Sequence, residues 1–143
     1  MVRVVAPPDR GRMQKVRVLL VDDGAEFLAS ASDFLSRDPR VEVVGQALHG
    51  REGVRLAEAL APDIVFMDLI MPVMNGLEAA RRIKSGLTPP RVIIVTLYDD
   101  QAYRRSAEIA GADGFIAKAN FAELALAMID AHFAATECPA NSS

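Results

Sequence analysis

The sequence predicts an α/β fold, a doubly wound five-stranded parallel sheet built from five successive βα units. Three observations predict it. Short runs of Val, Ile and Leu alternate with segments whose apolar residues recur at helical spacing. The runs are almost continuously apolar, as in strands buried on both faces of a parallel sheet, and right-handed crossovers then place helices on both faces. The length, 143 residues, fits a single domain.

The first two βα units are read from their hydrophobic patterns. A strand is expected at Val16–Val21, where VRVLLV runs into two carboxylates, and a second strand at Arg40–Ala47. The helix expected at Ala25–Arg37 carries on one side Phe27, Ala31, Phe34 and Leu35. The helix expected at Gly50–Leu60 has an inner face formed by Val54, Ala57 and Leu60.

The remaining three units follow the same alternation, and turn residues separate them. Pro89 and Pro90 mark the loop after the third helix, and Gly111 is suited to end the fourth. The expected strands and helices, in order, are Asp63–Met67, Leu77–Ser85, Arg91–Thr96, Asp100–Ala110, Gly114–Ala117 and Phe121–Phe133.

The last helix is apolar almost all round, which indicates burial beyond this domain. Phe121, Leu124, Met128 and Ile129 are expected to face the sheet, whereas Leu126 and Phe133 project elsewhere. We expect a partner or homodimer surface here, and the alternative is a helix covered by one of the chain's own terminal segments.

The chain is expected to have three regions. Residues 1–15 are expected to be a flexible arm, residues 16–135 one domain, and residues 136–143 a disordered tail.

Composition limits the function classes. The net charge of −3 argues against a nucleic-acid surface in this chain. No apolar stretch approaches a membrane span, and a single cysteine, Cys138, fits a reducing compartment. A cytoplasmic protein without membrane contact is expected.

Chemistry-bearing residues follow the ends of four expected strands. Ligands of parallel α/β sheets bind outside the carboxyl ends of the strands. The residues that the topology brings to that edge are Asp22, Asp23, Asp68, Thr96 and Lys118. Three carboxylates raise one another's pKa unless a cation compensates them, and Mg²⁺ prefers oxygen ligands. A carboxylate nucleophile, a metal site, a hydroxyl and an ammonium suffice to form an aspartyl phosphate.

The motifs resemble those of bacterial two-component response-regulator receiver domains, most closely receivers with a helix-turn-helix output domain, and no such domain is expected within these residues. The matching segments, which span Val16 to Phe133, are Val21-Asp22-Asp23, Met67 to Gly76, Val95-Thr96 and Gly111 to Lys118. The resemblance implies a flavodoxin-like fold with strand order 2-1-3-4-5, and no enzyme beyond assisting its own phosphorylation and dephosphorylation.

The resemblance also implies a role for each matching residue. Asp68 corresponds to the phosphoacceptor, and Thr96 and Lys118 to the pair that contacts the phosphoryl group. Asp22, Asp23, Asp68 and the backbone carbonyl of Ile70 correspond to the Mg²⁺ ligands. Phe115 corresponds to an aromatic switch residue coupled to Thr96. The phosphodonor in the family is the phosphohistidine of a sensor histidine kinase or histidine phosphotransfer protein.

Three positions depart from the family pattern. Gly24 follows the acidic pair where a polar or larger residue is frequent. Leu97 stands where many receivers have a small residue, so its bulk is expected to narrow access to the phosphate or hinder the loop's movement. Ala119 replaces a frequent proline, and the preceding peptide bond is therefore expected to be trans, because cis before a non-proline residue costs roughly 2.5–4 kcal/mol.

Other functions remain as alternatives. A receiver-like protein-interaction module with little or no phosphorylation would have no evident need for all five polar residues. A small aspartyl-phosphate phosphatase would carry Asp-x-Asp after the first strand, whereas Asp22 and Asp23 are adjacent. A flavin-binding carrier would need a Ser/Thr/Gly-rich phosphate loop at that position. Whether the chain stands alone or is part of a longer DNA-binding regulator is left open.

Overall fold

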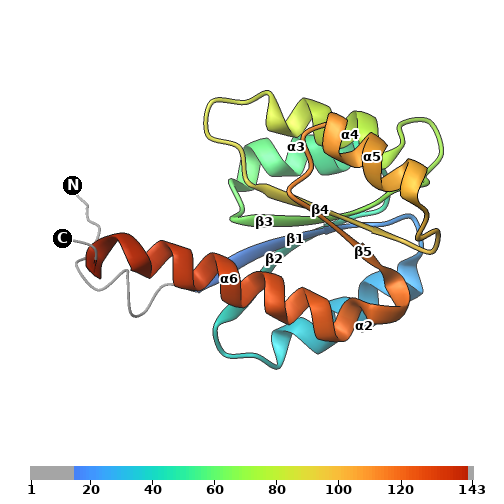
Figure 1. Cartoon of the computed structure of the whole chain (residues 1–143). Helices are drawn as coiled ribbons and strands as arrows, with labels where there is room; N and C mark the ends of the chain where they lie inside the picture. The colour runs from blue at the N-terminus through green and yellow to red at the C-terminus, as the bar shows by residue number, and fades with distance from the viewer. Residues whose placement is uncertain (1–14, 142–143) are drawn as a thin grey trace.

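The structure, a computed structural model, describes residues 15–141, with side-chain surroundings through residue 132. The expected flexible arm therefore lies outside the described residues, apart from Lys15, which is exposed before the first strand. A five-stranded parallel sheet with the order β2-β1-β3-β4-β5 forms the centre of the fold (Figure 1). The predicted α/β class and the strand order 2-1-3-4-5 are confirmed.

Strands and helices alternate along the described chain. The strands are β1 (Val16–Val21), β2 (Val41–Ala47), β3 (Ile64–Asp68), β4 (Arg91–Thr96) and β5 (Gly114–Ala117). The helices are α2 (Ala25–Ser36), α3 (Gly50–Leu60), α4 (Gly76–Lys84), α5 (Gln101–Ile109) and α6 (Phe121–Asn141), with a short 3₁₀ turn, η2 (Lys118–Asn120), between β5 and α6.

Helices cover both faces of the sheet, as the doubly wound prediction requires. Helices α2 and α6 lie on one face and α3, α4 and α5 on the other (Figure 1). Successive strand residues point to opposite faces, so Val18 and Leu20 pack toward α2 and α6, whereas Leu19 and Val21 pack toward the other layer. Burial on both faces explains why the strand sequences are continuous apolar runs.

Two aspartates fix the edge of the sheet at which the strands begin. The carboxylate of Asp63 accepts a hydrogen bond from the backbone N–H of Arg17 at 2.8 Å, which ties the start of β3 to β1. Asp113 accepts from the backbone N–H of Val92 at 2.8 Å and from Lys84 Nζ at 2.7 Å, which ties β5, β4 and α4 together. This edge is held by structural contacts, and the opposite edge is left for the polar residues at the strand ends.

Several predicted boundaries shift slightly because the flanking residue is a cap. Asp100 precedes α5 as its N-cap, and its carboxylate accepts from the N–H groups of Ala102 and Tyr103. The residues after three helices are likewise C-caps, so α2 ends at Ser36, α4 is Gly76–Lys84 and α5 ends at Ile109. Two strands also differ by one residue at one or both ends: β2 starts at Val41 and β3 is Ile64–Asp68. Gly111 ends α5 with φ +97°, as predicted for a glycine cap.

The inner faces of the outer helices were predicted only in part. In α2, Ala31 and Leu35 are buried as expected, but Leu28, which the sequence reading did not select, is buried as well. In α6 the buried residues are Phe121, Ala125 and Ile129.

Two expectations for α6 side chains were wrong. Leu124 is exposed rather than facing the sheet, and Leu126 packs against the core rather than projecting away from it. The physical reason is that the buried stripe of α6 runs through Phe121, Ala125 and Ile129 at helical spacing, so the small Ala125 occupies its centre in place of a larger side chain.

The last helix is also longer than predicted. It ends at Asn141 rather than Phe133, so residues 136–141 of the expected disordered tail are helical, and residues 142–143 lie outside the described residues. The Ala134-Ala135 pair that follows Phe133 has the highest intrinsic helix propensity and favours continuation. The far part of α6 projects beyond the sheet (Figure 1). Within the described residues, no helix is both long and apolar enough to cross a membrane.

Candidate functional site

Polar residues end four of the strands and meet at one edge of the sheet. Asp22 and Asp23 directly follow β1, Asp68 is the last residue of β3, Thr96 is the last residue of β4, and Lys118 follows β5. Because the parallel strands end at the same edge, the pairing of Asp68 with Val95 and of Thr96 with Ala117 brings these positions together. The structure thus assembles the predicted constellation.

The three carboxylates form a compact cluster. One carboxylate oxygen of each of Asp22, Asp23 and Asp68 lies within 4.8 Å of the others. Asp22 and Asp68 are buried, whereas Asp23 is exposed at the mouth of the cluster. Asp22 Oδ1 accepts a hydrogen bond from the N–H of Gly24 at 2.7 Å, so the loop after β1 fixes this side chain. Asp68 therefore has two carboxylate neighbours, the firmly held Asp22 and the solvent-facing Asp23.

Lys118 supplies the positive charge of the site. Its Nζ lies 2.7 Å from Asp22 Oδ2 and 3.7 Å from Asp68 Oδ1. The same ammonium sits over the ring of Phe27, 4.6 Å from the ring centroid. Phe27 was expected only to share one side of its helix with other apolar residues. Its contact with Lys118 was not predicted, because nothing in the sequence indicates that the first turn of α2 meets the residue after β5.

The environment of Asp68 disfavours its ionised form. Burial is the main cause, and together with the neighbouring carboxylates of Asp22 and Asp23 it raises the pKa of Asp68 to about 7, although Lys118 acts in the opposite direction. The charge of Lys118 alone does not offset these effects, so ionised Asp68 is unfavourable unless further positive charge reaches the cluster.

The donor set fits a hard divalent cation. Asp22 Oδ2 is buried and accepts no hydrogen bond of good geometry; it meets Lys118 only as an ion pair. A carboxylate oxygen without a hydrogen-bond donor, within reach of two further carboxylates, is suited to an oxygen-coordinated ion such as Mg²⁺. Ile70 lies in the loop just after Asp68, and its side chain is exposed. Its backbone carbonyl as a metal ligand stays a prediction.

Thr96 is completely buried at the end of β4. Its Oγ1 accepts a hydrogen bond from the backbone N–H of Tyr98 at 3.0 Å, so the hydroxyl is already engaged by the loop that follows. The Leu97 side chain between them is 72% exposed. The effect of Leu97 on access to the site stays a prediction.

Phe115 is partly buried in β5 and packs against the core layer of α3, α4 and α5. The guanidinium of Arg104 lies over its ring, 4.8 Å from the centroid, and Arg104 Nε also contacts Asp99 Oδ1 at 2.9 Å. Phe115 is thus in contact with a residue that also binds the loop after Thr96. Its role as a switch stays a prediction.

The loop that leaves Asp68 is closely fitted. A Cβ at Gly76 would collide with the backbone carbonyl oxygen of Asp68, and the Gly76 N–H donates to the Leu69 carbonyl at 2.8 Å. The next helix can therefore start against the phosphoacceptor candidate only with glycine at this position. Val73, at the tip of the loop, has φ +68° and is 94% exposed.

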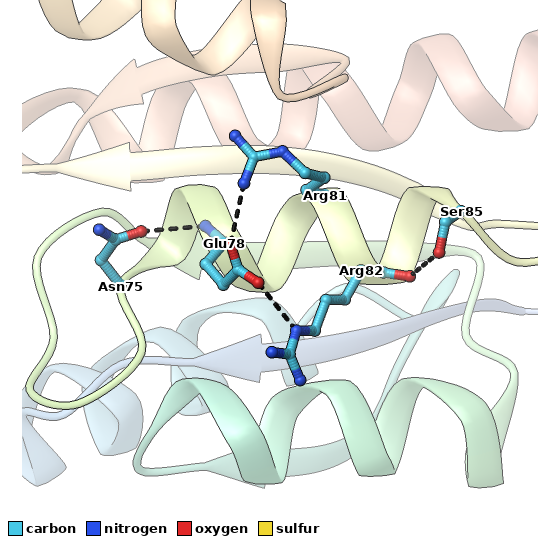
Figure 2. A network of polar contacts seen from close by, with 5 residues as sticks. All are labelled: Asn75, Glu78, Arg81, Arg82 and Ser85. Carbon is cyan, nitrogen blue, oxygen red and sulfur yellow. Dashed lines mark hydrogen bonds and ion pairs between the residues drawn. The ribbon is translucent and has the colours of Figure 1, made fainter.

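Helix α4 begins at the end of this loop with a side-chain cap. Asn75 Oδ1 accepts from the Glu78 N–H at 2.9 Å, and Glu78 in turn pairs with Arg81 and Arg82 along the exposed side of α4 (Figure 2). Ser85 Oγ donates to the Arg82 carbonyl at the other end.

No described peptide bond is cis, so the trans bond expected between Lys118 and Ala119 is confirmed.

A family model described as the response regulator receiver domain matches residues 18–130. The chain belongs to the response-regulator receiver family. The predicted resemblance is therefore confirmed, and the matched span lies inside the expected domain of residues 16–135.

Two relatives of this receiver are longer proteins, and the similarity covers only part of each. The transcriptional regulatory protein LiaR of Bacillus subtilis is 43% identical over 90 residues, which cover 62% of this chain and 43% of LiaR. A protein-glutamate methylesterase/protein-glutamine glutaminase of Geobacillus kaustophilus is 43% identical over 107 residues, covering 74% of this chain and 31% of that protein. The chain spans less than half the length of these curated relatives.

A solved receiver has the same fold. The signal receiver domain of the putative response regulator NarL from Mycobacterium tuberculosis matches with a TM-score of 0.78 and 34% identity, covering 82% of this chain and 96% of that one. The alignment covers almost all of an isolated receiver domain, which agrees with the sheet order and layering described above.

Proposed function

We propose that this receiver accepts a phosphoryl group on Asp68 with the help of Mg²⁺ and changes conformation in response. The observation that carries the proposal is the partly buried cluster in which Asp22, Asp23 and Asp68 present oxygens within 4.8 Å, with Lys118 Nζ 3.7 Å from Asp68. This set contains a nucleophile, a cation site and a charged donor at one strand edge.

The reaction follows from the placement of the side chains. A carboxylate oxygen of Asp68 attacks phosphorus, so that an O–P bond forms as the P–N bond of a phosphohistidine breaks. The departing nitrogen keeps the electron pair and takes up a proton. Lys118, already beside Asp68, pairs with a phosphoryl oxygen, and the Thr96 hydroxyl donates to a second.

The cation would be held by Asp22, Asp23, Asp68 and the backbone carbonyl of Ile70. When bound, Mg²⁺ neutralises charge on the carboxylates and on the phosphoryl oxygens. Asp22, which now pairs with Lys118 at 2.7 Å, would then share its charge with the cation and leave the lysine available to the phosphoryl group.

The new charge of about −1.5 to −2 on Asp68 would act on the residues next to it. Thr96 is engaged by Tyr98, and Phe115 touches Arg104, which binds Asp99 in the same loop. We propose that reorganisation of this loop is the output and that it controls a partner or an output domain. The chain acts as a phosphoacceptor that assists its own phosphorylation and dephosphorylation, not as an enzyme on other substrates.

The partner that supplies the phosphoryl group is proposed to be a sensor histidine kinase or a histidine phosphotransfer protein. Phosphoramidate carries the same type of P–N bond and can stand in for that donor. Incubation with phosphoramidate and Mg²⁺ should add one phosphoryl group by intact mass spectrometry. Asp68→Asn, or EDTA with the wild type, should abolish the addition, whereas Asp33→Asn on the exposed side of α2 should not.

The outcome separates the alternatives. A chain that is never labelled under these conditions would be an interaction module without phosphorylation. Continuous release of phosphate from a phosphoester such as p-nitrophenyl phosphate would indicate a phosphatase. Labelling that persists in Asp68→Asn would overturn the assignment of the phosphoacceptor.

A further inference from the structure

The ammonium of Lys118 has three neighbours in the site, and the proposed phosphoryl chemistry explains only two of them. Two of its neighbours are carboxyl groups, those of Asp22 at 2.7 Å and Asp68 at 3.7 Å. The third is the face of the Phe27 ring, whose centroid is 4.6 Å from Nζ. A cation over the face of an aromatic ring is attracted by the ring's quadrupole. This arrangement is a cation–π contact inside the site.

The ring itself is held in place by other aromatic residues. Phe27 meets Phe121 edge to face, with centroids 5.3 Å apart and an interplanar angle of 75°. Phe121 meets Phe66 of β3 in the same way at 5.4 Å and 76°. Phe121 is buried and begins α6, directly after the short turn that starts with Lys118. One segment therefore contacts Phe27 twice, through the ammonium of Lys118 and the ring of Phe121.

We propose that Phe27 is a positioning residue for phosphoryl transfer, which holds the Lys118 ammonium against the buried carboxyl groups of Asp22 and Asp68. This inference rests on the proposed function. The ring attracts the ammonium but carries no net charge, so it keeps the lysine at the site without competing for it as a further carboxylate would. If Asp22 shared its charge with a bound Mg²⁺ and no longer held the lysine, the ring would still restrain Lys118 next to Asp68.

An aliphatic side chain would fill the space but would lack the attractive face. Phe27→Leu should therefore slow labelling by phosphoramidate and Mg²⁺ about three- to tenfold, as expected for losing a contact of this class. Phe27→Tyr keeps the ring and should stay within about twofold of the wild type. Phe34→Leu is the matched control, because Phe34 lies on the same helix and packs against the same core without a described contact to Lys118.

A second readout separates positioning from packing. Protons above an aromatic ring resonate upfield, so the ε-methylene protons of Lys118, assigned in lysine-labelled protein by NMR, should be displaced in the wild type. The displacement should vanish in Phe27→Leu and persist in Phe27→Tyr and Phe34→Leu. Phe27→Met replaces Phe27→Leu in both measurements if the latter does not fold.

Equal slowing of labelling in Phe27→Leu and Phe34→Leu would overturn the proposal, since the ring would then serve only to fill the core. An unchanged Lys118 resonance in Phe27→Leu would also overturn it. If the wild type is not labelled at all, the proposed function fails. The resonance comparison still decides independently whether Phe27 holds Lys118.

Discussion

Asp68 illustrates how a single residue balances stability against reactivity. Its side chain is 6% exposed and surrounded by two carboxylates and one ammonium. Burial and like charge raise its pKa to about 7, so without a bound cation the protonated form of Asp68 is favoured far more than that of an exposed aspartate. The residue that is best placed as a nucleophile is therefore destabilising in its nucleophilic form.

Asp68→Asn should stabilise the metal-free protein, and more so at high pH. The folded state binds a proton at Asp68 between about pH 4 and pH 7 that the unfolded state has already lost, so wild-type stability falls as pH rises through this window. Urea unfolding in EDTA should show that the gain from Asp68→Asn is larger at pH 8 than at pH 5, by about 2 kcal/mol. The same gain at both pH values would contradict the raised pKa.

The residues at the strand ends were predictable, because each one interrupts an apolar run at the point where a parallel strand must end. Asp22, Asp68 and Thr96 stand out in this way. The contact of Phe27 with Lys118 was not predictable, because it depends on how two segments far apart in the chain approach each other. An aromatic residue at helical spacing reads as core whether or not a lysine lies over its face.

At the scale of single elements, the start of α4 is fixed by its cap rather than by its ion pairs. Asn75 satisfies the N–H of Glu78, whereas the pairs of Glu78 with Arg81 and Arg82 are exposed and contribute little (Figure 2).

Asn75→Ala should lower the free energy of unfolding by about 1 kcal/mol, because the Glu78 N–H loses its partner. Asn75→Ser keeps a capping oxygen and should retain most of the stability. Urea denaturation of the three proteins measures both effects. A Ser variant as unstable as the Ala variant would show that the cap is not the cause.

Self-association through α6 stays a prediction, with a narrower basis than its sequence indicated. Of the large apolar residues between Phe121 and His132, Leu126 packs on the core and Leu124 is the exposed one. The sequence shows that this helix is apolar almost all round, but it does not show which of its apolar residues face the sheet and which face solvent.

Sedimentation velocity should reveal a dimer if α6 is the contact, and Leu124→Glu should weaken it. The measurement should be made over a range of concentrations, with and without beryllofluoride as a phosphate analogue. A monomer at high concentration in both states would contradict self-association.

On the scale of the whole molecule, one edge of the sheet is held by structural hydrogen bonds of Asp63 and Asp113, and the other concentrates charge. Fold class and the charged edge follow from the alternation of apolar runs and the polar residues that end them, whereas the strand order came from the resemblance to receiver domains. The length of α6 does not follow, because local helix propensity past Phe133 is not visible in a core-facing pattern.

Binding of Mg²⁺ to this edge should stabilise the folded state as a whole. At ten times the dissociation constant, the stabilisation is about 1.4 kcal/mol, which should raise the melting temperature by several degrees. Asp23→Asn should remove most of this shift, because it removes one of the proposed Mg²⁺ ligands. Since Asp23 is exposed, the substitution leaves the core intact. Asp33→Asn should retain it. A full shift in Asp23→Asn would exclude Asp23 as a ligand.

The fit of Gly76 against the Asp68 carbonyl bears on which sequences this loop can tolerate. If codons 71–76 were randomised and the pool selected for folded protein, position 76 should return glycine alone, because even one added carbon meets backbone. Position 73 should drift away from valine toward glycine and asparagine, which adopt its positive φ more readily. Two positions only three residues apart would thus differ sharply in the substitutions they tolerate. The more restricted one, position 76, lies against the backbone of the phosphoacceptor candidate.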